Sequence, residues 1–374
     1  MPVGRRELER WSQKQQQSNT VASNATSRVI RDAHTSGTLN LSGKGLDAVP
    51  TEILKWYQPI GDENWWDIVA LRKLDLSHNA FTSVPHELFL PLSELQTLHM
   101  GNNLLEALPP SLACSATLQR INLQRNNFSV LPPAICECLQ LVCLNVDHNA
   151  IRRLPESLGD LLILETLSAS HNQLSNVPES IGNCRALTTV VLASNMLVEL
   201  PSSLGRVVAL TELQLSHNKL ERMPESIAQL SLLVRLDCRE NKLAQSPTLP
   251  RSSRLSEVLF GFNRLQMLPS DLGAAAPSLS VLDVRDNLIA DVDISALLPL
   301  KKLKTLDLRN NNIGTLPPPL GTMTSISSLL LEGNPLKTMR RTLITATARE
   351  ILEYLRGRMS EGDWAALAAS GGGG

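Results

Sequence analysis

The chain has 374 residues, of which 43% are hydrophobic but only 3% aromatic, and it carries 35 lysines and arginines against 36 aspartates and glutamates. Its length would allow two or three ordinary domains, and the apolar fraction is ample for a core. The balanced charge excludes a general attraction to nucleic acid or to an anionic membrane surface. No apolar run approaches the ~20 residues of a membrane-spanning helix, so no membrane span is expected.

The N-terminal segment, residues 1–36, is predicted to be polar and to end in a cap helix. Its first residues, MPVGRRELERWSQKQQQ, include no apolar stretch of the kind that a secretory signal contains, so none is expected. Arg5 to Gln17 is predicted to be a polar helix, and the following QQQSNTVASNATS a flexible linker. A second helix, Ser27 to His34, is expected to cover the open end of the fold.

One pattern organises residues 37–336. In LTTVVLASNMLVELP, the residues Leu187, Val190, Leu192, Asn195 and Leu197 fit L-x-x-L-x-L-x-x-N-x-L, which is the leucine-rich-repeat frame. Successive asparagines of this frame are 22 to 24 residues apart. We number the repeats 1 to 12 by these asparagines, which are Asn79, Asn103, Asn126, Asn149, Asn172, Asn195, Asn218, Asn241, Asn263, Asn287, Asn311 and Asn334.

This frame predicts an α/β fold, a leucine-rich-repeat solenoid or horseshoe with a concave parallel β-sheet and short helices or turns on the convex side. Apolar residues two apart point to one side of a short strand, and each coil stacks its strand on the previous one at about 4.8 Å. The asparagine amide can donate to and accept from backbone groups that lose water inside the stack.

The first coil and the connection after it depart from the frame. TLNLSGKGLDAVP fits with Lys44 in place of asparagine, which predicts a degenerate coil before repeat 1. An insert at about residues 50–68 follows and carries Trp56, Tyr57, Trp65 and Trp66. The favoured interpretation is a hydrophobic clasp that closes the N-terminal end of the core. The alternative is an aromatic docking patch, since these residue types are enriched in binding hot spots.

The return segments and the C-terminal end give further expectations. A proline after the strand in repeats 1 to 7 predicts a short helical turn after it. Repeat 8 has SPTLPRSSRL instead, which should be extended, and repeat 10 uses VDISALLPL. Residues 337–359 are predicted to form a basic, amphipathic cap helix over the last coil, and residues 360–374 a flexible tail.

The concave face is the candidate binding surface. Its middle is small and uncharged, and beyond it an acid in mid-strand is followed two residues later by a base in three coils. Either these charges neutralise each other and keep an exposed sheet soluble, or apolar anchors and charged rims fix a partner. The candidate partner-binding residues are Thr189, Val191, Glu212, Gln214, Arg235, Asp237, Arg239, Leu259, Phe262, Asp283, Arg285, Asp307 and Arg309.

No catalytic, metal or cofactor site is predicted. The P-loop, G-x-G-x-x-G, G-x-S-x-G and H-E-x-x-H motifs are missing from the sequence. A histidine precedes the asparagine in four repeats, at His78, His148, His171 and His217. Solvated turn positions explain these four better than a metal does, because only two of them are on adjacent coils.

The cysteines favour a reducing compartment. Cys138, Cys184 and Cys238 fall at core positions of the frame, whereas Cys143 faces out from a strand and Cys136 lies on the convex turn. No cysteine cluster flanks the array as it commonly does in extracellular proteins of this type. We therefore expect a cytoplasmic protein.

Three stretches resemble the family of leucine-rich-repeat-containing protein 40. They are HTSGTLNLSGKGLDAVP, NWWDIVALRKLDLSHN and LLLEGNPLKTMRRTLITATAREILEYLRGRM, and SPTLPRSSRLSEVLFGFNRL is also similar. The repeats are in addition similar to those of Ras-group intracellular leucine-rich proteins. The resemblance implies an intracellular, non-enzymatic horseshoe protein and transfers no catalytic or ligand residue. The glutamine-rich N-terminus and the glycine tail match no family motif.

These observations predict an intracellular, non-enzymatic scaffold or adaptor, with a role in signalling, that binds a protein partner on its concave face. The candidate partners are a small GTPase, a phosphatase or an assembly subunit, with no nucleic acid and no cofactor. The alternative is a permanent structural subunit of a large assembly, such as a cytoskeletal or ciliary complex.

Overall fold

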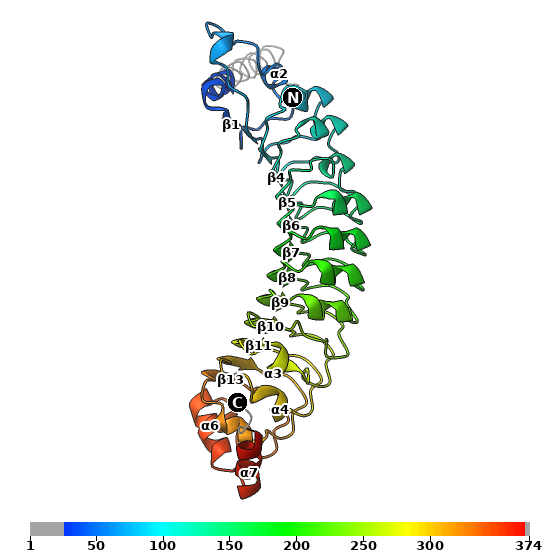
Figure 1. The fold of residues 1–374 in the computed structure, drawn as a ribbon. Helices are drawn as coiled ribbons and strands as arrows, with labels where there is room; N and C mark the ends of the chain where they lie inside the picture. The colour runs from blue at the N-terminus through cyan, green and yellow to red at the C-terminus, as the bar shows by residue number, and fades with distance from the viewer. Residues whose placement is uncertain (1–25, 371–374) are drawn as a thin grey trace, which may run out of the picture. The chain divides into compact units, whose positions relative to one another are not determined.

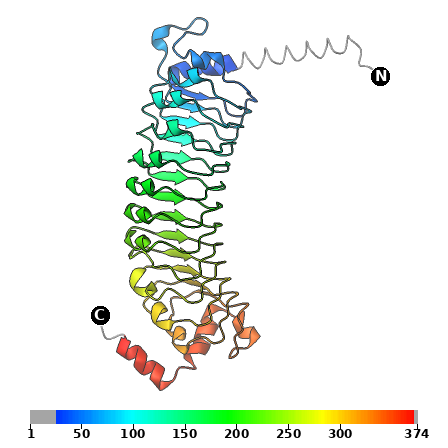
Figure 2. The same ribbon diagram turned by 90° about the vertical axis from the view of Figure 1, so that its right-hand side faces the viewer.

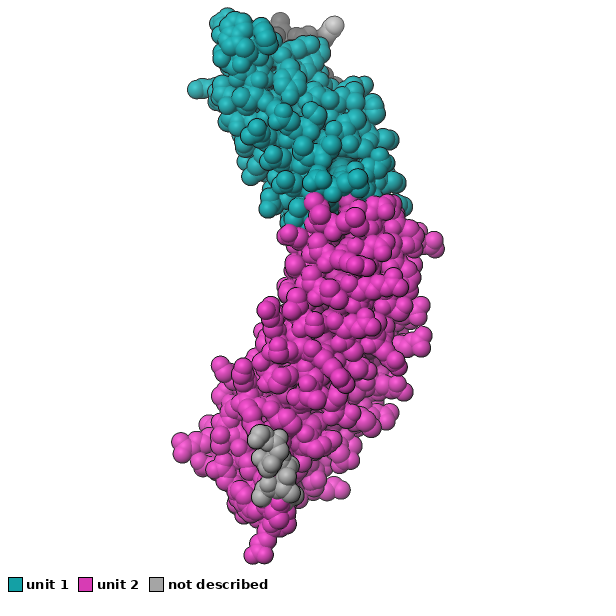
Figure 3. All heavy atoms as spheres, viewed as in Figure 1, with its two compact units in different colours: residues 1–149 teal, residues 150–374 magenta. Residues whose placement is uncertain are grey.

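The computed structural model describes residues 26–370, which fall into two compact units, 1–149 and 150–374 (Figure 3). The expected polar helix at Arg5 to Gln17 and the linker after it lie outside the described residues. In both units the strands line one side of the coils and short helices line the other (Figures 1 and 2). No helix in the described part of the chain has the length and apolar character to cross a bilayer.

The first unit is built on parallel strands that neighbour one another in chain order. Leu39 pairs with Leu74 and Leu74 with Leu98, so the buried middle residues of the strands stack on one another. The strands are β1 (Thr38–Asn40), β2 (Lys73–Asp75), β3 (Thr97–His99), β4 (Arg120–Asn122) and β5 (Cys143–Asn145). The helices are α2 (Thr51–Leu54), η1 (Trp65–Asp67), η2 (His86–Phe89), η3 (Pro110–Cys114) and η4 (Pro133–Ile135).

The N-terminal end of this unit is closed by a helix, by the degenerate coil and by part of the insert. Residues 26–36 are helical, as expected for the cap, and bury Ile30 and His34. The amide of Asn79 reaches back to the degenerate coil, where it donates to Leu41 O and accepts from the N–H of Leu46. β1 therefore belongs to the sheet although its own coil lacks the asparagine.

The tryptophan insert serves as a clasp only in part. Trp56 is fully buried, and its indole N–H donates to the carbonyl of Val69 at 2.8 Å. The ring of His34 meets the Trp56 ring edge to face at 4.7 Å. Trp65 and Trp66 in η1 are exposed instead.

The second unit repeats the same arrangement through eight parallel strands. They are β6 (Thr166–Ser168), β7 (Thr189–Val191), β8 (Glu212–Gln214), β9 (Arg235–Asp237), β10 (Glu257–Leu259), β11 (Val281–Asp283), β12 (Thr305–Asp307) and β13 (Ser328–Leu330). The opposite side carries η5 (Glu156–Asp160), η6 (Glu179–Asn183), η7 (Ser202–Arg206), η8 (Glu225–Gln229), α3 (Leu272–Ala275), α4 (Ile294–Leu297) and η9 (Pro318–Thr322).

The asparagine of each repeat ties its coil to the preceding one. The Asn195 amide oxygen accepts from the N–H of Leu174 at 2.9 Å, and its nitrogen donates to Ala169 O at 2.9 Å, both in the coil before. The same nitrogen also donates to Leu192 O at 3.0 Å and Ala193 O at 3.2 Å within its own coil. These bonds satisfy backbone groups that the stacked coils would otherwise bury without a partner.

The return segments follow the proline pattern of the sequence. In repeats 1 to 7 the proline directly precedes a short 3₁₀ helix, as Pro201 precedes η7. The turns pack tightly: a Cβ on Gly205 would lie 2.4 Å from the carbonyl oxygen of Ser226 in the next coil. Residues 245–254 of repeat 8 form no helix, as expected, and repeat 10 forms α4.

The C-terminal cap consists of short helices, whereas the sequence predicts one helix over 337–359. α5 (Arg341–Ile344) and α6 (Ala348–Arg356) are separated at Thr347, which begins α6 with a capping box to Glu350. α6 packs on η9, and the Arg356 side chain donates to Gly321 O at 3.2 Å. The predicted flexible tail is also wrong in part, because Glu361–Ser370 form α7; residues 371–374 lie outside the described residues.

Candidate protein-binding face

The candidate surface is the outward side of strands β7 to β12, all in the second unit, which we call the strand face. In β9, Leu236 and the following Cys238 point into the core, so Arg235, Asp237 and Arg239 point outward. The register places each outward residue beside its equivalents on the neighbouring strands, as Glu212, Arg235 and Glu257. All the predicted partner-binding residues thus lie on one face.

The small, uncharged part of the strand face lies at β7. Thr189 and Val191 are half-buried, and Val191 lies between Ser168 and Gln214 in register. Gln214 donates to Glu212 at 2.7 Å within its own strand. This part of the strand face therefore offers a partner neither a charged nor a large exposed apolar side chain at Thr189 and Val191.

Arg235 joins three strands by ion pairs. Its guanidinium lies 2.7 Å from Glu257 on β10, 3.9 Å from Glu212 on β8 and 3.7 Å from Asp237 on its own strand. All these side chains except Asp237 are about one-third exposed. Arg235 is thus fully engaged by carboxylates, so a partner would have to replace existing contacts to use it.

Two coils carry a buried aspartate held by the arginine two residues later. Asp237 is only 2% exposed and receives two bonds from Arg239, at 3.0 and 2.6 Å. Asp307 and Arg309 repeat this geometry at 3.0 and 2.7 Å. These bonds raise the pKa of both arginines above the usual value. Paired planar groups of this kind hold a fixed orientation. In these two coils the geometry supports the interpretation that the charges neutralise each other, and we call this repeated Asp–Arg pairing the ladder.

Repeats 9 and 10 break the ladder. Arg285 approaches Asp283 only to 3.6 Å, and its guanidinium lies over the ring of Phe262 at 5.2 Å. Gly261 occupies the position equivalent to Arg239 in the coil before and Arg285 in the coil after, and a Cβ there would lie 3.1 Å from Arg285 Cγ. Because Gly261 has no side chain, the Arg285 side chain can extend over the neighbouring coil.

Asp283 and Phe262 are the unusual residues at this break. Burial raises the pKa of the Asp283 carboxyl, and its neighbour Asp307 adds to the effect, while the backbone N–H and charge of Arg285 oppose it. Phe262 is 43% exposed and has a φ of 58°, a left-handed conformation that the repeat imposes on the residue before each asparagine. Few bulky side chains adopt it.

Leu259 does not match the predicted role of apolar anchor. It is 7% exposed, because it lies in register between Asp237 and Asp283, on strands that each carry an arginine two residues further on. Leu259 alternates with buried Val258 and Phe260, as an outward position should, yet it is buried as well. Phe262 is therefore the predicted apolar residue that a partner can reach.

The residues considered for metal binding are dispersed. His78, His148, His171 and His217 are all exposed and lie at the left-handed position. His217 pairs with Glu240 at 2.7 Å. Among the described residues no cluster of histidines, cysteines and carboxylates has the geometry to hold a metal ion. Burial raises the pKa of the Cys138 thiol to about 12.

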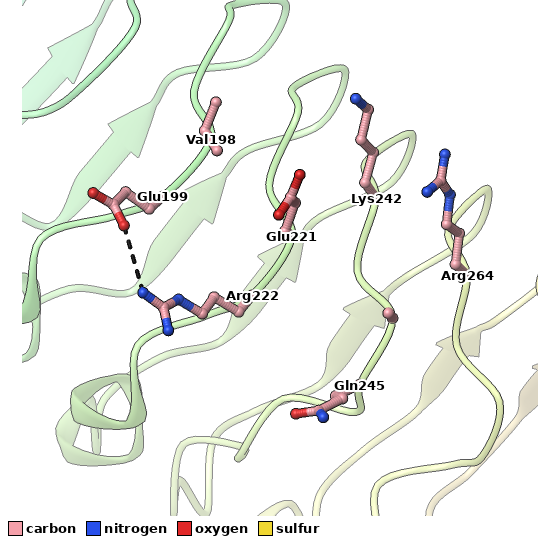
Figure 4. A pocket seen from close by; sticks show the side chains of 8 residues that line it. Val198, Glu199, Glu221, Arg222, Lys242, Gln245 and Arg264 are labelled. Atoms are coloured by element: carbon pink, nitrogen blue, oxygen red, sulfur yellow. Dashed lines mark ion pairs between the residues drawn. The ribbon is translucent and has the colours of Figure 1, made fainter.

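A hollow that the predicted site residues do not include lies on the loops that follow the asparagines. It measures about 650 Å³ and is lined by Val198, Glu199, Glu221, Arg222, Lys242, Ala244, Gln245 and Arg264. Figure 4 shows Lys242 and Arg264 extending from adjacent loops, and Glu199 paired with Arg222 at 3.7 Å. A second hollow of about 570 Å³ shares Ala244 and Gln245 and runs along the helix-free segment. The irregular SPTLPRSSRL was the sequence signal for it.

Comparisons with known proteins agree with the fold. A family model described as leucine rich repeat matches residues 69–128 and 277–336, and a second model with the same description matches 164–184 and 209–230. A leucine-rich-repeat protein of Leptospira interrogans is 22% identical with a TM-score of 0.62, over 89% of this chain and 97% of that one. The internalin InlF of Listeria monocytogenes is 21% identical with a TM-score of 0.67, over 84% and 86%.

Several of the similar structures contain a bound peptide hormone. One is the plant peptide hormone receptor RGFR1 in complex with RGF2, which is 26% identical with a TM-score of 0.67 over 79% of this chain. The present chain spans about half of that receptor, 47% of its length. The chain contains leucine-rich repeats and has the fold of a leucine-rich-repeat solenoid.

Proposed function

We propose that this protein is a cytoplasmic, non-enzymatic scaffold that binds a protein partner on the strand face of its second unit. The observation that supports this best is the break at repeats 9 and 10. There Phe262 is exposed and Arg285 lacks the two-bond pairing that Arg239 and Arg309 have. An aromatic ring beside an arginine without such a two-bond pair has the composition of an interface hot spot.

The surroundings of this pair support a protein rather than a small molecule as ligand. The strand face is open, and its ion pairs around Arg235 form a polar rim on one side of Phe262. The eight strands of the second unit, β6 to β13, include the strand face and at about 4.8 Å each give a length of roughly 35–40 Å, enough for the ~800 Å² per partner of a standard interface. The likeness to a receptor that holds a peptide hormone agrees with this use of the fold.

Cytoplasmic placement is the part of the proposal that rests on cysteine chemistry. Cys138, Cys184 and Cys238 are buried at core positions of their coils. Burial raises the pKa of Cys138 and Cys238, which keeps them as unreactive thiols. A small GTPase, a phosphatase or an assembly subunit remain the partner classes to examine.

The test is proximity labelling in the native cell, followed by pull-down with the variant Phe262→Ala/Arg285→Glu. We expect the main partner of the wild-type protein to be lost from the variant. A matched control, Leu162→Ala/Arg254→Glu, changes an exposed apolar residue and an exposed arginine away from the strand face and should retain it. An unchanged set of bound proteins with the first variant would reject this surface.

A further inference from the structure

A second exposed aromatic surface lies in the first unit, in the connection between α2 and β2. We call Trp65 and Trp66 the aromatic patch; the same segment also exposes Tyr57 and Val69. Trp65 is 68% and Trp66 65% exposed, and their rings meet edge to face at 5.8 Å. In Figures 1 and 2 the light-blue segment that carries η1 extends beyond the first coil. Two adjacent indole side chains that are both about two-thirds exposed are typical of a surface that binds a partner.

The segment is fixed to the cap at several points, so its exposure is not due to a loose chain. Buried Trp56 holds its far end through the bond to Val69 O. Glu63 accepts from the N–H of Ile60 at 2.9 Å and lies 2.8 Å from Nδ1 of buried His34. The tryptophans are thereby presented in a preorganised position, which lowers the entropy cost of binding.

The charge around the patch selects the kind of partner. Between Trp56 and Leu71 the sequence has Asp62, Glu63 and Asp67 and no lysine or arginine. Asp62 and Asp67 are exposed. On the positive side, Lys55 directly precedes Trp56 and is exposed, and Arg31 of the cap helix lies against Gly61, with a guanidinium nitrogen 3.0 Å from the place of a Cβ.

The negative charge near Tyr57 is partly neutralised. Burial raises the pKa of the Tyr57 hydroxyl, and the charge of Glu94 adds to the effect. Glu94 in turn lies 3.8 Å from Arg72 in a weak and exposed ion pair. The segment itself therefore keeps an excess of negative charge around its tryptophans. An anionic lipid surface would be repelled by that charge, whereas a cationic side chain is attracted both by the carboxylates and by the indole faces.

We propose that the aromatic patch is a docking site for a basic, extended segment of a partner protein. Arginine or lysine side chains of that segment lie on the faces of Trp65 and Trp66, and Asp62 and Asp67 set their position. This site is independent of the strand face, since its residues all belong to the first unit.

The test uses the full chain and a random peptide library displayed on phage. Peptides are selected on the wild-type protein and counter-selected on Trp65→Ala/Trp66→Ala. Because both side chains are exposed, this variant should fold, which a thermal melt checks. We expect the recovered peptides to be enriched in arginine and lysine. Fluorescence anisotropy with a labelled recovered peptide should show a loss of affinity of about tenfold in the tryptophan variant.

Two further variants separate the contributions. Asp62→Asn/Asp67→Asn should weaken binding of the same peptide and reduce the dependence of its affinity on salt concentration. Leu90→Ala/Val130→Ala, which removes exposed apolar side chains elsewhere in the unit, should leave the affinity unchanged. Recovered peptides without an excess of basic residues, or equal affinity for the tryptophan variant, would overturn the proposal. So would tryptophan-dependent binding to phosphatidylcholine vesicles with about 20% phosphatidylserine, since that identifies a membrane surface.

Discussion

Replacing Asn195 by alanine tests the physical basis of the solenoid. The side chain is 7% exposed; its oxygen accepts from Leu174 N–H, and its nitrogen faces the carbonyls of Ala169, Leu192 and Ala193. Truncation leaves at least the N–H of Leu174 buried without a partner. Such a group costs about 1–3 kcal/mol, so we expect the free energy of unfolding to fall by about that amount.

Urea unfolding followed by far-ultraviolet circular dichroism measures this loss as a lower midpoint. Asn312→Ala is the matched control, because this asparagine is exposed and stands one residue after Asn311 of the frame. Asn195→Asp keeps an acceptor but sets a carboxylate against three carbonyl oxygens. It should therefore be at least as harmful at neutral pH, and less so in acid, where the carboxyl is protonated. A midpoint and slope equal to those of the wild type for Asn195→Ala would refute the reasoning.

Three other predictions follow from individual contacts. Gly205→Ala places a methyl 2.4 Å from a carbonyl oxygen of the next coil and should lower the melting temperature, by about 1–3 kcal/mol in stability, whereas Gly314→Ala has open space and should not. Iodoacetamide at pH 8 should label exposed Cys114 and spare Cys138, whose pKa burial raises to about 12; equal labelling by mass spectrometry would contradict this. The pKa of Asp283 is raised in the folded protein, so its contribution to stability is fully present below its pKa in the unfolded chain and is lost as the pH rises through its pKa in the folded protein. Asp283→Asn should therefore remove this decrease from the pH dependence of the free energy of unfolding.

The repeat frame predicted the parts of the fold that depend on local sequence. The phase of every strand, the proline before the 3₁₀ helices of repeats 1 to 7 and the helix-free segment of repeat 8 follow from residues within one period. The frame also placed the asparagines that bond to the preceding coil. The C-terminal end has no following coil to fix its phase. There the sequence predicted one cap helix and a flexible tail, and the structure has α5, α6 and α7 instead.

The candidate site was less accessible to the same reasoning, because it depends on contacts between coils. The frame assigned Leu259 to the outward side, yet its burial depends on the neighbouring coils, where its register partners Asp237 and Asp283 lie 22 and 24 residues away in sequence. When Arg239 was chosen as a partner-binding residue, the frame likewise could not show that its guanidinium donates two hydrogen bonds to Asp237. Which charges are free on such a face is a property of neighbouring strands.

Phe262 shows how stability and binding can be separated on this face. At the equivalent position Asn102 and Asn310 adopt the same left-handed backbone, with φ of 54° and 51°, and asparagine tolerates it far better than an aromatic residue does. The strain amounts to about 1–2 kcal/mol, against which the contact with Arg285 returns about 0.5–1 kcal/mol. We therefore expect Phe262→Asn to raise the unfolding midpoint slightly while it abolishes capture of the partner. If the substitution instead destabilises the fold, the ring is a structural element of repeat 9, and the binding proposal loses its main support.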